Sequence, residues 1–163
     1  MGVRDAAPAD IEAIRRVARR SWEADYPAIL SRETAESGFD EWYAPAELEA
    51  ELAHPRTVLA VAEAEGTVVG FVHAVTDDEL GHVLRLYVDP AHRRAGFGRR
   101  LLDHVVDEMA RLGIGRARAL VLADNDLGIE FYRSAGFETV DEAQTTIDGT
   151  AYRELAMERA ISR

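Results

Sequence analysis

The sequence predicts an α/β fold in which helices cover both faces of a mixed β-sheet. Apolar, β-branched runs alternate along the chain with segments of helical periodicity, and this interleaving is typical of a sheet with helices on both sides. The chain has 163 residues, of which 47% are hydrophobic, so it can bury a core without disulfides or structural metals. We therefore predict one domain spanning residues 1–163.

The N-terminal half is expected to contain three strands and two helices. Residues 10–24 place Ile11, Ile14 and Trp22 on one helical face, with arginines and acidic residues opposite. Two β-branched runs flank the dipeptide Glu65-Gly66, which is typical of a hairpin. The predicted elements are a strand at 3–6, helices at 10–24 and 45–54, and strands at 57–63 and 68–76.

The C-terminal half predicts a further alternation of strands and helices. Residues 98–112 form the strongest amphipathic pattern, with Leu101, Leu102 and Val105 on one face and Gly113 as the C-terminal stop. The dipeptide Asp148-Gly149 is typical of a tight turn between two final strands. The predicted elements are strands at 82–88 and 116–122, helices at 98–112 and 125–134, and two strands around residues 148–149.

The charge balance limits the classes of partner. The chain carries 30 acidic and 19 basic residues, a formal net charge of −11, and every basic residue is arginine. Such a surface repels nucleic acid and anionic membranes but attracts cationic amines. No leader pattern opens the sequence and no run of about 18 apolar residues occurs, so we expect a soluble, cytoplasmic protein. The absence of cysteine and the scattered positions of the five histidines predict no metal site.

A strand-to-helix junction at residues 86–102 carries the clearest functional signal. Arg93, Gly96 and Gly98 form an Arg-x-x-Gly-x-Gly segment that opens directly into the helix 98–112. The backbone N–H groups of a first helical turn lack intrahelical partners, and the helix dipole adds positive charge, so this junction suits a pyrophosphate. The glycine spacing differs from the dinucleotide and P-loop fingerprints. The alternative is an ordinary turn whose glycines serve only the backbone geometry.

The junction resembles the pyrophosphate loop of the GNAT superfamily, the acetyl-CoA-dependent N-acetyltransferases. The family pattern is Gln/Arg-x-x-Gly-x-Gly/Ala after a strand that ends in Val-x-Pro, and it is matched at Val88, Pro90, Arg93, Gly96 and Gly98. A second family segment, Asn-x-x-Ala-x-x-x-Tyr-x-x-x-Gly-Phe, is matched at Asn125, Tyr132, Gly136 and Phe137, with Gly128 where alanine is usual. The resemblance covers about residues 57–137. It implies a GNAT-like central sheet of six or seven strands, mixed but mostly antiparallel.

The resemblance also implies a binding site for acetyl-CoA as co-substrate. The strand before the loop would offer backbone groups to the pantetheine arm and the acetyl carbonyl, and the loop amides would hold the pyrophosphate. Asn125 would fix the pantetheine arm. The implied cofactor-binding residues are Leu86, Tyr87, Val88, Arg93, Arg94, Ala95, Gly96, Phe97, Gly98, Arg99 and Asn125.

Two residues are candidates for proton transfer. The resemblance implies that Tyr132 is the general acid, and a phenol with an ordinary pKa of about 10 is protonated at pH 7 and can donate to a departing thiolate. Core packing is the alternative role for this tyrosine. An alkylammonium acceptor must first lose a proton, and His82 is the predicted base because imidazole titrates in the useful range. Glu79, Asp78 or a chain of waters are the alternatives.

The predicted function is transfer of an acetyl group from acetyl-CoA to a primary amine by direct attack in a ternary complex. The acceptor could be a polyamine-like amine, an amino-acid or antibiotic amine, or a protein N-terminus or lysine. Residues expected over the acceptor cleft are Trp22, Glu23, Asp25, Tyr26, Phe39, Trp42 and Tyr43. The alternatives are a non-catalytic acyl-CoA sensor or partner-binding module, and transfer of a longer acyl chain or transfer to a hydroxyl. The family further implies a homodimer formed through the C-terminal strands.

Overall fold

The strands of the described residues form one seven-stranded sheet. The computed structural model describes residues 2–25, 44–93, 95–147 and 149–161. The strands are β1 (Gly2–Asp5), β2 (Thr57–Ala64), β3 (Thr67–Thr76), β4 (Leu80–Val88), β5 (Arg116–Leu122), β6 (Glu138–Ile147) and β7 (Thr150–Ala160). Their order across the sheet is β1-β2-β3-β4-β5-β7-β6, and only β4 and β5 pair in parallel. The prediction of a mixed, mostly antiparallel sheet is confirmed.

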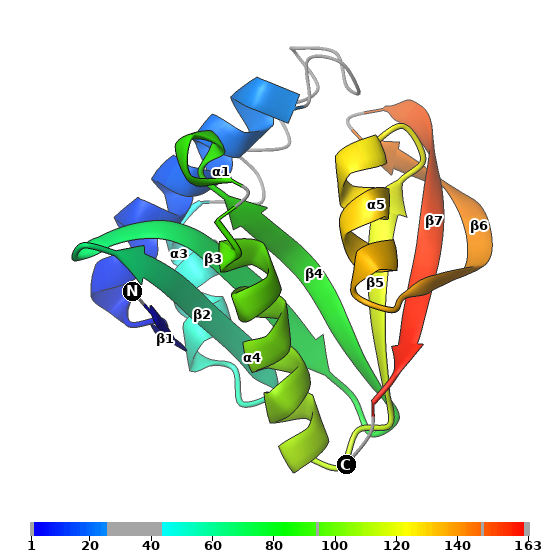
Figure 1. Cartoon of the computed structure of the whole chain (residues 1–163), viewed down its shortest axis with the longest axis horizontal. Helices are drawn as coiled ribbons and strands as arrows, with labels where there is room; N and C mark the ends of the chain where they lie inside the picture. The colour runs from blue at the N-terminus through cyan, green and yellow to red at the C-terminus, as the bar shows by residue number, and fades with distance from the viewer. Residues whose placement is uncertain (1, 26–43, 94, 148, 162–163) are drawn as a thin grey trace.

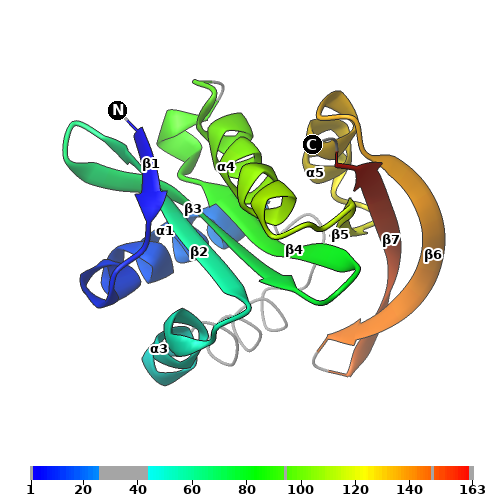
Figure 2. The same ribbon diagram turned by 90° about the horizontal axis from the view of Figure 1, so that it is seen from below.

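Helices cover both faces of this sheet, as predicted (Figures 1 and 2). The helices are α1 (Ile11–Asp25), α3 (Pro45–Ala53), α4 (Phe97–Arg111) and α5 (Asp126–Ser134), with short 3-10 turns at Pro8–Asp10 and Pro90–His92. Helices α4 and α5 lie on one face, and α1 and α3 lie on the other. Each predicted helix and strand is present with its ends shifted by a few residues at most.

The core is divided by the sheet into two apolar clusters. On the α4 side, Leu101, Leu102 and Met109 are fully buried, which confirms the predicted apolar face of that helix. On the α1 side, Ile14 and Trp22 pack with residues of β2 and β3, as the periodicity of residues 10–24 predicts. The sheet is therefore buried on both faces along its central strands, and side-chain alternation assigns each residue to one cluster.

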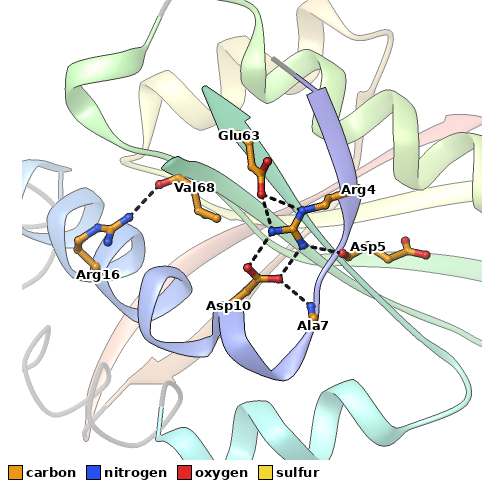
Figure 3. A network of polar contacts seen from close by, with 7 residues as sticks. All are labelled: Arg4, Asp5, Ala7, Asp10, Arg16, Glu63 and Val68. Carbon is orange, nitrogen blue, oxygen red and sulfur yellow. Dashed lines mark hydrogen bonds and ion pairs between the residues drawn. The ribbon is translucent and has the colours of Figure 1, made fainter. Parts of the chain in front are cut away.

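A polar network fixes the start of α1 against the edge of the sheet (Figure 3). The Arg4 guanidinium donates to both Asp10 oxygens at 2.8 and 2.9 Å and donates through Nε to Glu63 Oε1 at 2.8 Å. The Ala7 amide also donates to Asp10 Oδ2, at 2.7 Å. The hydrogen bonds from Arg4 hold the pKa of the Asp10 carboxyl below its ordinary value. The network joins β1, the first 3-10 turn and β2, and so positions the helix whose other end carries Trp22.

The buried His73 of β3 is expected to make folding stability depend on pH. Its Nδ1 lies 3.6 Å from Glu51 Oε2 of α3, and Arg85 Nη2 of β4 lies 3.5 Å from the other oxygen of that carboxylate. Burial, followed by the positive charge of Arg85, lowers the pKa of His73 to about 4. The unfolded chain binds this proton near pH 6.5, so stability is present above that pH and falls as the pH drops toward 4.

The comparison of wild type with His73→Gln isolates this contribution. We expect the free energy of unfolding of wild type, relative to the variant, to fall by about 3 kcal/mol between pH 7 and pH 4. Urea denaturation at several pH values measures this difference. The exposed His54 provides the control, because His54→Gln should keep the wild-type pH dependence. A His73→Gln curve parallel to the wild-type curve would contradict a buried, neutral His73.

Candidate active site

The site forms where the two parallel strands separate. The pairing of β4 with β5 ends at Val83 and Ala119, and a register shift in the β3–β4 ladder leaves Leu84 as an extra residue at that point. Beyond it, β4 continues to pair with β3 but diverges from β5 (Figure 1). Residues 84–88 and 120–122 instead line a cavity of about 740 Å³, a volume typical of small-molecule sites.

The N-terminus of α4 opens onto this cavity as an anion site. Gly96 is the N-cap residue with a φ of 86°, no side chain caps the helix, and the Arg100 amide donates to Gly96 O at 3.1 Å. The three amides before Arg100 therefore have no helical acceptor, and the dipole adds positive charge there. A Cβ built on Gly96 would meet no atom within 4 Å, so the loop is open. These features fit a pyrophosphate.

Gly98 and Phe97 pack the N-terminus of α4 against its neighbours. A Cβ on Gly98 would lie 3.2 Å from Phe131 Cε1 of α5, so glycine lets the first turn of α4 pack closely beside α5. The Phe97 side chain is buried in the core under α4. Phe97 can therefore contact a ligand at the cavity mainly through its backbone.

Asn125 caps α5 at the edge of the cavity. Its Oδ1 accepts a hydrogen bond from the Gly128 amide at 3.0 Å. A Cβ on Gly128 would lie 2.7 Å from Asn125 Nδ2, so an alanine at this position would require the Asn125 carboxamide to shift. The carboxamide nitrogen of Asn125 takes no part in this cap, and Asn125 lines the cavity.

Tyr132 of α5 lies in the wall of the cavity and is 9% exposed. Phe131 and Phe137 pack against its ring, each with its centroid 5.2 Å away in an edge-to-face arrangement. Burial, with a smaller contribution from Tyr87, raises the pKa of the Tyr132 phenol above its ordinary value. The phenol is therefore a proton donor throughout the physiological range.

Most of the predicted site residues come together at this cavity. The predicted residues that line it are Leu86, Tyr87, Val88, Arg93, Gly96, Phe97, Gly98, Arg99, Asn125, Tyr132 and Trp22. Ala95 is exposed in the loop and is not among the lining residues. Arg94 lies outside the described residues, as do Tyr26, Phe39, Trp42, Tyr43 and the side chain of Asp25.

The predicted base His82 lies away from the cavity. Its Nε2 is 3.0 Å from Asp77 Oδ2, on the part of β4 that still pairs with β5. Backbone hydrogen bonds from Leu80 and Glu79, followed by the bond to His82, lower the pKa of Asp77 to about 2. Glu23 is exposed on α1 and does not line the cavity either. The role of His82 stays a prediction.

Several cavity residues were not anticipated from the sequence. They include Leu84 of β4, Leu120 of β5 and Glu154 of β7. Leu84 and Leu120 are 47% and 50% exposed, which is unusual for leucine in a central strand. Two exposed leucines near the point where the pairing of β4 with β5 ends are the signal that could have indicated Leu84 and Leu120. The alternation of apolar and polar residues alone does not show which face of the sheet carries a cavity.

These features define a transferase that binds a phosphate-bearing co-substrate in an opening of its sheet. The family model described as Acetyltransferase (GNAT) family matches residues 11–137. The chain belongs to this family, and it is an acyltransferase that uses acetyl-CoA.

Two relatives and one solved structure illustrate the similarity. A spermidine N(1)-acetyltransferase of Thermoplasma acidophilum is 31% identical over 143 residues, covering 85% of this chain and 89% of the relative. The N-alpha-acetyltransferase RimI of Mycobacterium tuberculosis is 34% identical over 144 residues, covering 83% and 82%. The crystal structure of the PaiA N-acetyltransferase of T. acidophilum with coenzyme A covers 97% of both chains, with a TM-score of 0.87 and 28% identity.

The described part of the chain shows neither a metal-binding cluster nor a helix that could span a membrane. Among residues 2–25, 44–93, 95–147 and 149–161, His, Asp and Glu side chains form no group of three suited to a metal ion. Within the same ranges, no helix combines the length and the apolar character needed to cross a bilayer.

Proposed function

We propose that this protein transfers the acetyl group of acetyl-CoA to a primary amine by direct attack in a ternary complex. The supporting observation is one cavity lined from both faces of the sheet, by α4 and α5 on one side and by Trp22 of α1 on the other. Acetyl-CoA and the acceptor can thus approach from opposite faces and meet where β4 and β5 diverge. Direct attack needs no acyl-enzyme, and the chain has no cysteine that could form a thioester-linked one.

The residues of the cavity suit the steps of this reaction. The amides of residues 97–99 and the nearby arginines bind the pyrophosphate. The edge of β4 that faces β5 is unpaired after Val83, so its backbone groups can bind the pantetheine arm and polarise the thioester carbonyl. The Tyr132 phenol donates its proton to the thiolate as the carbon–sulfur bond breaks.

We propose a cationic primary amine as the acceptor, with spermidine as the first compound to test. The net charge of −11 attracts such amines. One relative acts on spermidine, whereas another, the ribosomal protein bS18-alanine N-acetyltransferase of Escherichia coli, is 33% identical over 79 residues. A peptide that begins with alanine is therefore the second acceptor to test.

Steady-state assays test the transfer directly. With acetyl-CoA present, we expect release of free thiol and gain of one acetyl group by spermidine or the alanine peptide, detected by mass spectrometry. Binding of acetyl-CoA without turnover over a broad panel of amines would contradict the proposal and favour the non-catalytic acyl-CoA-binding module. Turnover only with longer acyl-CoA thioesters, or with an alcohol, would favour the other alternative.

A further inference from the structure

Glu154 lies on the face of the sheet opposite to the pyrophosphate site. In β7, Leu155 and Met157 pack into the core under α4, whereas Tyr152 packs against the α1-side cluster. Alternation along a strand places Glu154 on the same face as Tyr152. Glu154 pairs with Leu122 of β5 in the ladder and lines the cavity. Its carboxylate therefore lies in the half of the cavity on the α1 side, opposite to the half proposed for the coenzyme.

The same half of the cavity also carries apolar side chains. In β5, Ala117, Ala119 and Val121 belong to the α4-side core, so Leu120 faces the other way, beside Leu122. Leu84 and Leu120 are two of the five exposed large hydrophobic residues among the described ones, and both line this cavity. Leu120, Leu122 and Trp22 place apolar side chains beside the Glu154 carboxylate. The Arg85 guanidinium lies on this face as well, where it pairs with Glu51. An alkyl chain that ends in an ammonium group fits these apolar side chains and the Glu154 carboxylate.

The Glu154 carboxylate has no ion pair or hydrogen bond within the described part of the chain, unlike Glu158 two pleats further along β7, which pairs with Arg116 and Arg118. Burial alone raises the pKa of Glu154 above its ordinary value. The other titratable side chains that line the cavity are Arg85, Tyr87, His92, Arg93, Arg99 and Tyr132. Raised pKa values in a cleft are typical of groups that exchange protons with substrate.

We infer that Glu154 binds the ammonium group of the acceptor and takes one of its protons, which makes Glu154 the general base of the proposed transfer. This inference rests on the proposed function. Glu154 and Tyr132 then divide the proton transfers between two elements, β7 on the acceptor side and α5 on the coenzyme side. His82 contacts Asp77 through Nε2 and does not line the cavity.

The protons balance in this scheme. The acceptor R–NH₃⁺ transfers one proton to the Glu154 carboxylate, and the free amine then forms a carbon–nitrogen bond to the thioester carbonyl carbon. The carbon–sulfur bond breaks, and the thiolate takes the Tyr132 proton to give coenzyme A. The second proton of the nitrogen returns to the Tyr132 phenolate as the amide forms, and Glu154 releases its proton to solvent.

The variant Glu154→Gln tests this inference against Glu138→Gln, which changes an exposed carboxylate on β6 outside the cavity. Spermidine binding to the coenzyme A complex is measured by calorimetry, and kcat/KM is measured from pH 6 to pH 10. We expect Glu154→Gln to weaken spermidine binding at least tenfold and to lower kcat/KM about 100-fold at pH 7. The deficit should shrink toward pH 10, where more of the amine is already deprotonated.

Three results would overturn the inference. The first is a Glu154→Gln variant that matches Glu138→Gln in both measurements. The second is a kcat/KM deficit of equal size at every pH, which indicates a positioning role. The third is a His82→Gln variant that loses activity at pH 7 and regains it at pH 10. Wild type that binds spermidine without turnover would refute the proposed transfer, while the calorimetry still decides whether Glu154 holds the ammonium group.

Discussion

Replacement of Gly96 by glutamate is expected to weaken the binding of acetyl-CoA and coenzyme A at least 100-fold. Gly96 has a φ of 86°, which costs a residue with a Cβ about 1–2 kcal/mol. Its Cβ position faces open space at the uncapped N-terminus of α4, so the new carboxylate would occupy the place proposed for the pyrophosphate and repel it. Isothermal titration with both ligands measures the loss.

Gly66 supplies a matched control for this experiment. It lies in the turn between β2 and β3, has a φ of 80°, and a Cβ there would also meet no atom within 4 Å. Gly66→Glu therefore introduces the same backbone strain and the same charge away from the cavity, and should bind acetyl-CoA like wild type. A Gly96→Glu variant with wild-type affinity would place the pyrophosphate elsewhere.

Replacement of Tyr132 by phenylalanine is expected to lower kcat by about 100- to 1,000-fold and to leave the Kd for acetyl-CoA within about twofold of wild type. The phenylalanine ring keeps the packing against Phe131 and Phe137, so only the proton donor is lost. Burial raises the pKa of the phenol, so Tyr132 should stay protonated at a higher pH than an ordinary tyrosine. We therefore expect no fall in the kcat of wild type from deprotonation of Tyr132 up to pH 10.

The control for the tyrosine variant is Tyr152→Phe on β7. Tyr152 is partly buried against the α1-side cluster and does not line the main cavity, so its loss of a hydroxyl should leave kcat unchanged. Single-turnover kinetics with saturating acetyl-CoA separate the chemical step from product release. Equal single-turnover rates for Tyr132→Phe and wild type would assign Tyr132 to core packing alone.

The coenzyme half of the site was largely predictable because its signals are local. Gly96 and Gly98 lie in one contiguous loop, and the helix that follows is defined by its own periodicity. Helix N-terminal amides bind anions wherever such a junction forms, so the chemistry follows from local sequence. The structure brings nine of the eleven residues implied for coenzyme binding to one cavity.

In the half of the cavity proposed for the acceptor, Trp22 was predictable from the sequence, but the residues of β5 and β7 were not, because they depend on strand order. The chain after α5 continues into β6, yet β7 inserts between β5 and β6 and brings Glu154 beside Leu122. Nothing in the pattern of residues 150–160 indicates which strand will be its neighbour. The sequence therefore predicts His82 as the base, near the start of the strand that precedes the loop, whereas the base that we propose from the structure, Glu154, lies 72 positions further along.

The sequence by itself determined the elements, the two-sided burial of the sheet and the loop proposed for the pyrophosphate, because each depends on residues within one turn or one strand. Only the tertiary structure decided where the sheet opens and which side chains meet there. Strand pairing and side-chain facing depend on partners distant in the chain, and a single register shift opposite His73 and Ala74 changes the face that each following residue of β4 presents. Leu84 lines the cavity at that register shift, and Glu154 lines it because β7 pairs with β5.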